Sequence, residues 1–176
     1  MPREEVASPQ PVLLGFLMLG PGHPYELNKL FRRDLGSVWR VGQSHIYAHL
    51  TRLAELGLAK AVTETQDSRP NRIVYRITSA GKKSFLEWIH QPTQHVRNIR
   101  LEFLARLYFF RRLELPGLPD LVAGQKALLQ SRFKSLAEAI ASTEDEYGRM
   151  VIDFRRCEIK AIIGWLDRCQ KQGKKT

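Results

Sequence analysis

The chain has 176 residues, and its 28 lysines and arginines exceed its 18 aspartates and glutamates by ten. A hydrophobic content of 43% excludes disorder along the whole chain, and two cysteines exclude a disulfide-stapled secreted scaffold. The net charge of +10 favours an anionic partner, nucleic acid ahead of a membrane surface. The first residues lack the layout of a signal peptide, and the apolar run Val12–Leu19 is shorter than the ~20 residues that cross a bilayer. We therefore expect a cytoplasmic protein without a membrane partner.

Two helices are predicted before residue 36. The run Val12–Leu19 is apolar enough for a buried helix, which Pro21 and Gly22 end. Pro24 suits the first position of a second helix, and Glu26 suits the positive end of its dipole. Apolar residues then recur at helical spacing up to Gly36, where the second helix should end.

A third helix and a β-hairpin follow. Ser44 is the expected N-cap of a helix that runs to about Leu56, with Gly57 as the residue after its C-cap. The period then changes to two in residues 72–78, and residues 58–65 form a weaker strand candidate. The six residues 66–71 between them are turn formers and give the hairpin a basic tip.

The rest of the chain is predicted to be helical. Thr78 should cap a fourth helix over residues 79–90, and residues 91–95 form a short linker. A helix from about residue 96 to 110 has two apolar stripes, so it must be covered on two sides. A heptad pattern can be written over residues 119–147, and Gly148 should interrupt it before a last helix.

The apolar residues of these later helices favour dimerisation over an intramolecular bundle, the alternative that remains. We therefore divide the chain into a DNA-binding domain over residues 1–90 and a helical dimerisation domain over residues 96–172. The predicted dimerisation residues are Phe103, Phe110, Leu129, Phe133, Leu136, Ile140, Phe154, Ile162 and Trp165.

The order helix, helix, turn, helix, basic hairpin is that of a winged helix-turn-helix, in a chain that is otherwise mainly α. Its third helix should bury Ile46, Leu50 and Leu53 on one face. The opposite face offers hydroxyl, imidazole, phenol and guanidinium groups that can bond phosphates and base edges. The predicted DNA-binding residues on this helix are Ser44, His45, Tyr47, Ala48, Thr51 and Arg52.

Arg69, Asn71 and Arg72 of the hairpin are placed for phosphate or minor-groove contact. The plainer alternatives are a solvated helix face and hairpin charges that only keep the protein soluble. Mixed Glu/Lys pairs, the usual mark of a solvated face, are scarce on the third helix, with Glu55 as the acid near its end. His49, at the border of the apolar stripe, should be packed.

Five segments resemble the PadR-type transcriptional regulators when they are taken in combination. They are Leu13-Leu-Gly-Phe-Leu, His23-Pro-Tyr-Glu-Leu, Val38-Trp-Arg-Val, Ile46-Tyr-Ala-His-Leu-Thr-Arg-Leu-Ala-Glu-Leu-Gly-Leu and Val74-Tyr-Arg-Ile-Thr-Ser-Ala-Gly. The resemblance implies a homodimeric repressor of a pseudo-palindromic operator in double-stranded DNA, with Ser44, His45 and Tyr47 on or near the DNA backbone. Ala48 departs from the family, which commonly has proline after the tyrosine. Members often respond to small aromatic compounds, and others respond to none, so release from DNA by an aromatic ligand remains open.

No enzyme, cofactor or metal is expected. The histidines show no His-Glu-x-x-His or comparable ligand spacing, and Cys157 and Cys169 are twelve residues apart on one predicted helix. Phosphate-binding glycine loops and a Gly-x-Ser-x-Gly nucleophile turn are missing from the sequence. Trp39, Tyr108 and Trp165 could line an aromatic ligand pocket, although packing in the core explains them as well. The alternative function is a winged-helix module that binds a protein partner without sequence-specific DNA binding.

Overall fold

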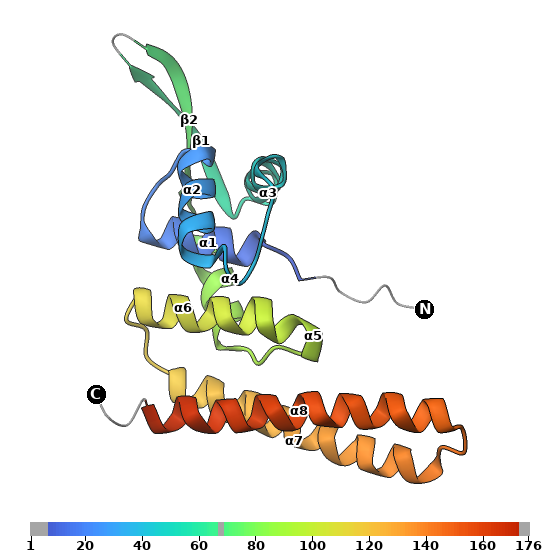
Figure 1. Ribbon diagram of the computed structural model, residues 1–176. Helices are drawn as coiled ribbons and strands as arrows, with labels where there is room; N and C mark the ends of the chain where they lie inside the picture. Colours follow the sequence, from blue (N-terminus) through green and yellow to red (C-terminus); the bar gives the residue numbers. More distant parts are fainter. Residues whose placement is uncertain (1–6, 67–68, 173–176) are drawn as a thin grey trace. The chain divides into compact units, whose positions relative to one another are not determined.

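A computed structural model of the chain describes residues 7–66 and 69–172 and consists mainly of helices (Figure 1). The chain divides into two compact units. One contains residues up to Ile89 together with Arg97–Leu115, and the other contains His90–Val96 and the residues from Pro116 onward. The elements in chain order are α1 (Gln10–Leu19), α2 (Pro24–Leu35), α3 (Gln43–Glu55), β1 (Ala59–Gln66), β2 (Arg69–Ile77), α4 (Ser79–His90), α5 (Val96–Asn98), the π-helix η1 (Ile99–Phe103), α6 (Leu104–Arg112), α7 (Leu118–Ser142) and α8 (Glu146–Gln172).

The first unit confirms the predicted three-helix core and hairpin wing. Helix α1 buries every residue from Val12 to Leu17, as expected for a helix that is apolar all round. Helix α2 begins at Pro24, as predicted, and its start is closed by a capping box in which the His23 ring accepts from the Tyr25 amide and the Glu26 carboxylate accepts from the His23 amide. The buried side of α2 ends with Leu35.

Helix α3 differs from the prediction at its start and agrees with it at its end. The N-cap is Gly42 in extended conformation, and its carbonyl accepts from the Ile46 amide at 3.2 Å. Ser44 therefore lies inside the first turn, where its backbone is already helical, and it does not cap the helix. Gly57 adopts φ +70° and follows the C-cap as predicted, with its amide bonded to Ala54 and the next amide bonded to Leu53 in a Schellman arrangement.

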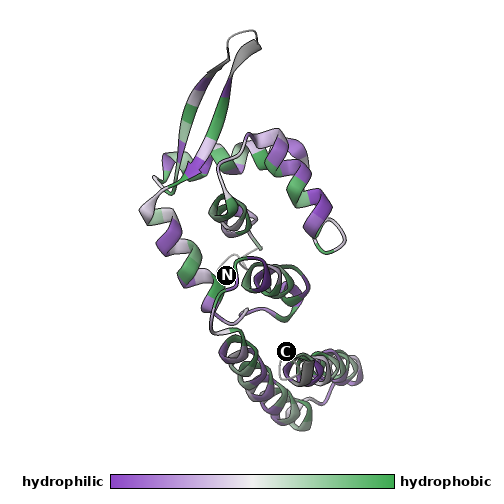
Figure 2. Ribbon diagram, turned by 90° about the vertical axis from the view of Figure 1, so that its left-hand side faces the viewer, coloured by the Kyte–Doolittle hydropathy of each residue, from purple (hydrophilic) through white to green (hydrophobic). Residues whose placement is uncertain are grey.

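The wing is a two-stranded antiparallel hairpin that extends away from the helices of its unit (Figure 1). Its register pairs Ala59 with Ile77 and Glu64 with Arg72, and Gln66 still pairs with Arg69. The strands are therefore longer, and the turn shorter, than the predicted six-residue tip. Pro70 is compatible with this strand because both strands of a two-stranded hairpin have a free edge. Figure 2 shows both green and purple bands along the strands, as expected for a hairpin that combines apolar and polar residues.

Two further contacts complete the first unit. Thr78 accepts from the Gly81 amide at 3.0 Å at the start of α4, which confirms it as the cap. Residues 97–115 pack with the N-terminal helices, where Gly15 of α1 lies so close to the Phe109 ring that a Cβ atom on Gly15 would stand 2.5 Å from it. The large apolar residues buried in this segment are Ile99, Phe103, Phe109 and Phe110. Phe109 lies on neither predicted stripe, and the stripe of Leu101, Leu104 and Tyr108 is only half-buried. The division into functional domains at residue 90 remains a prediction.

The second unit is a helical hairpin of α7 and α8. Lys126 and Asp167 form an ion pair at 2.6 Å, and Arg156 lies over the Phe133 ring at 4.8 Å, so the two helices run antiparallel. The predicted break at Gly148 is wrong. Helix α7 ends at Ser142, Thr143 is extended, and Gly148 lies in the first turn of α8 with its amide bonded to the Asp145 carboxylate. A side-chain cap at Asp145 therefore restarts the helix three residues before the glycine.

Candidate nucleic-acid interface

Helix α3 separates its residues into a buried and an exposed face as the sequence predicted. The side chains of Ile46, Leu50 and Leu53 are 0% exposed and anchor the helix to the core. The six residues predicted to face DNA are all exposed: Ser44, His45, Tyr47, Ala48, Thr51 and Arg52. The structure brings these six together on one helix surface, and their contact with DNA remains a prediction.

Two side chains on this surface, Arg52 and Tyr47, carry polar groups that are accessible to a ligand. Arg52 forms an exposed ion pair with Glu55 at 2.9 Å, one helical turn away. Exposed pairs of this kind contribute little free energy, so Arg52 can exchange Glu55 for a phosphate at small cost. Tyr47 is 38% exposed, which leaves its phenol available for a hydrogen bond.

His49 lies at the border of the buried stripe and is packed, as predicted. Its Nδ1 lies 3.4 Å from the amide nitrogen of the Gln10 side chain. Burial lowers the pKa of His49, and the neighbouring His45 lowers it further. This histidine therefore favours the neutral form and serves the contact between α3 and α1 rather than the exposed surface.

A cavity of about 460 Å³ opens beside the start of α3. It is lined by Trp39, Arg40, His45 and His49 together with the segment before α1. Its volume lies within the ~300–1,000 Å³ of small-molecule sites. Because His45 belongs to the predicted DNA-binding surface, a molecule in this cavity would touch that surface from the side.

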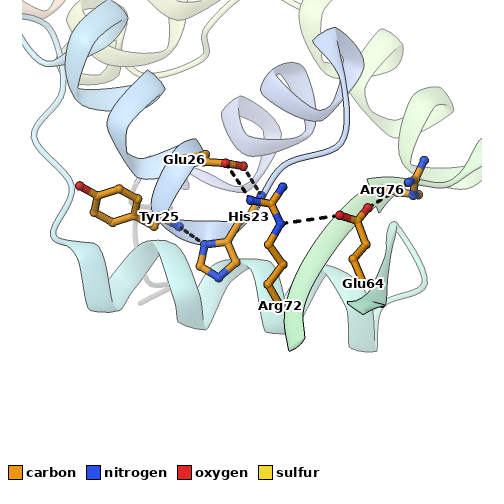
Figure 3. Close-up of polar contacts among 6 residues, drawn as sticks. All are labelled: His23, Tyr25, Glu26, Glu64, Arg72 and Arg76. Carbon is orange, nitrogen blue, oxygen red and sulfur yellow. Dashed lines mark hydrogen bonds and ion pairs between the residues drawn. The ribbon is translucent and has the colours of Figure 1, made fainter. Parts of the chain in front are cut away.

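The wing carries a chain of four charged side chains on the side that faces the start of α2 (Figure 3). Arg72 Nη1 donates to Glu26 Oε1 at 3.1 Å, and Arg72 Nε lies 3.6 Å from Glu64 Oε2. The other oxygen of Glu64 accepts from Arg76 Nη2 at 3.3 Å. The chain links α2 to both strands of the hairpin, and its two arginines balance its two carboxylates.

The Glu26 carboxylate has two roles in this arrangement. Its Oε2 accepts the His23 amide at 3.1 Å within the capping box of α2, while Oε1 holds Arg72. The hydrogen bond from the His23 amide and, after it, the contact with Arg72 keep the pKa of Glu26 below its usual value. Glu26 is therefore charged at neutral pH.

Three predicted wing residues thus have different outcomes. Arg72 is engaged with two carboxylates, which the sequence did not predict. Arg69 and Asn71 lie in β2, and their side chains are outside the described part of the structure. Glu26 and Glu64 were missed as partners. The hairpin register could have suggested Glu64, which is directly opposite Arg72, whereas Glu26 is 46 residues from it in sequence.

The predicted dimerisation residues differ in exposure. Phe103, Phe110 and Leu129 are buried within a single chain, so their side chains leave almost no area for a second copy. Phe133, Leu136, Ile140, Ile162 and Trp165 are half-buried. Phe154 is 64% exposed, and Tyr147 and Met150, which were not predicted, are 70% and 64% exposed at helical spacing with it. An apolar strip thus follows the first part of α8.

Within residues 7–66 and 69–172, three or more histidine, cysteine, aspartate or glutamate side chains do not gather in any arrangement suited to a metal ion. In the same part of the chain, every helix is too short or too polar to span a membrane.

Comparison with known proteins identifies relatives of the first unit and of nearly the whole chain. Residues 13–87 match the model of the transcriptional regulator PadR-like family. A negative transcriptional regulator PadR of Bacillus subtilis (strain 168) is 25% identical over 168 residues, which cover 88% of this chain and 91% of the relative. A probable transcriptional regulator, Rv1176c of Mycobacterium tuberculosis, is 32% identical over 73 residues, which cover 42% of this chain and 39% of the relative. The crystal structure of Bacillus subtilis PadR in complex with operator DNA has the same fold, with a TM-score of 0.50, 20% identity and coverage of 96% of this chain and 99% of that one.

Proposed function

Because this chain belongs, through residues 13–87, to the PadR-like family of transcriptional regulators, we propose that it is a sequence-specific DNA-binding repressor. It acts as a homodimer in the cytoplasm and has no enzymatic activity. The observation that carries the proposal is helix α3, whose apolar face is fully buried while its exposed face offers the groups that bond phosphates and base edges. The Bacillus subtilis relative is named a negative regulator, which supports repression.

In this function α3 enters the major groove with Tyr47, Thr51 and Arg52 toward the DNA, and α2 lies behind it. Ala48, in the middle of the exposed face, has a side chain small enough for the helix to approach closely. The wing lies beside the groove and reaches the neighbouring phosphates through its basic residues. Two copies related by a two-fold axis would read a pseudo-palindromic operator with half-sites about 34–36 Å apart.

The exposed apolar strip of Tyr147, Met150 and Phe154 supports the homodimer, because a strip of this kind on a helix favours contact with another surface. A dimer is also what paired half-sites require. Sedimentation at micromolar concentration should give about twice 20.3 kDa, and a monomer would contradict this part of the proposal.

The experiment that tests the function is a gel-shift titration against DNA from the protein's own genomic neighbourhood, with a scrambled duplex of equal length as competitor. We expect a retarded band that resists the competitor and weakens steeply with salt, because phosphate contacts release counterions. Competition by the scrambled duplex that is as effective as competition by the unlabelled DNA itself would favour the protein-interaction module instead. Genome-wide mapping of bound sites would then return the operator and the regulated genes together.

Regulation by a small aromatic ligand is a refinement of this function. The cavity beside α3, with Trp39 in its lining, supports it. A ligand that releases DNA must bind the free protein more tightly than the DNA complex, so it must also raise the melting temperature of the free protein. A compound that raises the melting temperature and leaves the gel shift unchanged would contradict this regulation.

A further inference from the structure

The wing is fastened to the start of α2 at two points along β2. The first is a backbone bridge, in which the Gly22 and Tyr75 amides each donate to the other's carbonyl at 3.1 and 3.0 Å. The second is the ion pair of Glu26 with Arg72, three residues closer to the tip. At ~3.3 Å per strand residue the two points are about 10 Å apart. The bridge and the buried side chains of Val74 and Tyr75 hold the base of the hairpin. The ion pair adds a contact nearer the tip, which fixes the direction of the outer part of the hairpin.

We propose that Glu26 is a positioning residue for DNA binding, because it holds Arg72 and thereby fixes the direction in which the wing leaves the helix-turn-helix. The inference rests on the proposed DNA-binding function and reassigns Arg72, which the sequence suggested as a phosphate contact. Arg72 is a brace within the protein. Nearer the tip, residues 65–71 contain one basic residue, Arg69, which is left as the phosphate contact of this part of the wing.

Glu26 is suited to this role because its own side chain is held in place. The hydrogen bond from the His23 amide to Oε2 orients the carboxylate, so Oε1 presents a fixed acceptor to Arg72. The capping box belongs to the first turn of α2, which is the first helix of the helix-turn-helix. The ion pair therefore sets the direction of the wing relative to α2, the helix that packs against α3.

The surroundings of Arg72 argue against a free phosphate contact. Its guanidinium lies between Glu26 and Glu64, and Glu64 in turn holds Arg76 across the hairpin. A phosphate that took Arg72 would approach two carboxylates and break both of their contacts with this arginine. The four charges of the cluster sum to zero, so this cluster adds little attraction for DNA.

Glu26→Gln distinguishes two roles of Arg72, a contact within the protein and a contact with a phosphate, because the two predict opposite changes in affinity for the operator. The amide oxygen of glutamine can still accept from the His23 amide, so the capping box remains, while the charge that holds Arg72 is lost. If Glu26 positions the wing, Kd for the operator rises about fivefold, which is the lower end of coupling effects between distant sites. The salt slope, meaning the slope of log affinity against log salt concentration, is then unchanged. If Arg72 contacts a phosphate, the variant binds more tightly, because a negative charge is removed and Arg72 is released. Tighter or unchanged binding overturns the proposal.

Arg72→Ala is a second test of whether Arg72 holds the wing or contacts a phosphate. A brace lowers affinity without changing the number of released counterions, whereas a lost phosphate contact lowers the salt slope by about one unit. Glu87→Gln on α4 is the matched control, because Glu87 is an exposed carboxylate in an ion pair with Lys83 away from the wing. It should leave both affinity and slope as they are. Exposed ion pairs contribute little to folding, so all these variants should melt near the wild-type temperature.

A distance measurement tests the brace without DNA. Spin labels on cysteines placed at Lys29 of α2 and Thr63 of β1, both exposed, report the direction of the wing in a chain whose Cys157 and Cys169 are replaced by serine. We expect a narrow distance distribution that Glu26→Gln broadens. An unchanged distribution overturns the proposal even if DNA binding falls. Failure of the wild-type chain to bind DNA would instead refute the proposed function, while this measurement would still decide whether Glu26 fixes the wing.

Discussion

Tyr108 of α6 donates a hydrogen bond from its hydroxyl to the Asp34 carboxylate of α2 at 2.5 Å, 74 residues away in sequence. Burial and this hydrogen bond raise the pKa of Tyr108 to about 12, so the phenol remains a donor throughout the neutral range. The same carboxylate accepts two hydrogen bonds from the exposed Arg33 guanidinium. The bond joins the helix-turn-helix to the segment 97–115 that packs in the same unit.

Removal of this bond should destabilise the first unit without disturbing its shape. Tyr108→Phe keeps the ring contacts with Phe16 and Phe109 and deletes the hydroxyl. Because the acceptor is charged and the site is half-buried, we expect a loss of about 1 to 2 kcal/mol in the free energy of unfolding, measured by urea titration. Tyr25→Phe, whose ring is 58% exposed, is the control and should change little. Equal effects of the two substitutions would contradict the assigned role of the bond.

The stability that Asp34 provides should depend on pH in the acid range. The hydrogen bonds from Arg33 and then from Tyr108 hold the pKa of Asp34 below its usual value, so the unfolded chain takes up its proton first as the pH falls. The contribution is therefore complete above the unfolded pKa of about 4 and is lost as the pH falls through the lower folded value. Wild type and Asp34→Asn should differ most in urea midpoint at pH 5–7 and converge toward pH 3. A difference that grows on acidification would refute this sign.

Gly15 should tolerate no side chain, because a Cβ there would stand 2.5 Å from the Phe109 ring. Gly15→Ala forces the ring or the helix to shift, and overpacking of this kind costs about 1 to 3 kcal/mol. Gly164→Ala is the matched control. It lies in α8 with nothing within 4 Å of the new Cβ, so it should stabilise its helix by about 0.5 to 1 kcal/mol. Phe109→Leu should relieve part of the cost of Gly15→Ala in the double variant.

The helix-turn-helix could be predicted well because its signals are local. The spacing of Ile46, Leu50 and Leu53 defines which face of α3 is buried, whatever the rest of the chain does. The N-cap of α3 was predicted wrongly, because residue type alone does not determine where a helix begins. Ser44 is a better N-cap by residue type, yet Gly42 takes the extended conformation in which the helix begins. A preference of a few tenths of a kcal/mol between serine and glycine at this position is easily overridden by the path of the preceding loop.

Contacts between distant segments could not be predicted from these patterns. Glu26 is an ordinary acid at the start of a helix, and only the folded hairpin brings Arg72 to it. The segment 97–115 was predicted to begin the C-terminal helical domain. It packs with the first unit instead, because Gly15 has no side chain and lets the Phe109 ring approach α1 closely. The sequence pattern placed a helix break at Gly148 and missed Asp145, whose carboxylate caps α8. A glycine inside a helix costs only about 1 kcal/mol, so it need not end the helix.

The exposed face of α3 should account for most of the specific affinity for DNA. Tyr47→Ala and Arg52→Ala should each cost about 1 to 3 kcal/mol of binding free energy while the fold remains, because both side chains are exposed. Fluorescence anisotropy at several salt concentrations would also show whether Arg52 meets a phosphate, which lowers the salt slope by about one unit, or a base. Lys160→Ala removes an exposed charge from α8 and is the control. Wild-type affinity in both α3 variants would show that another surface reads the DNA.

The homodimer should depend on the exposed strip of α8. Phe154→Glu places a charge where a second copy would cover an apolar ring, and by two-fold symmetry each interface loses two such rings. Burial of a phenylalanine contributes about 1.5 to 3 kcal/mol, so the dimer should weaken by about 3 to 6 kcal/mol and sediment near 20.3 kDa at micromolar concentration. Since Phe154 is 64% exposed in the single chain, its replacement should leave the helical content unchanged. Arg155→Glu adds the same side chain one position along, on another side of the helix, and should remain dimeric. A dimer of unchanged stability in Phe154→Glu would move the interface to another surface of the chain.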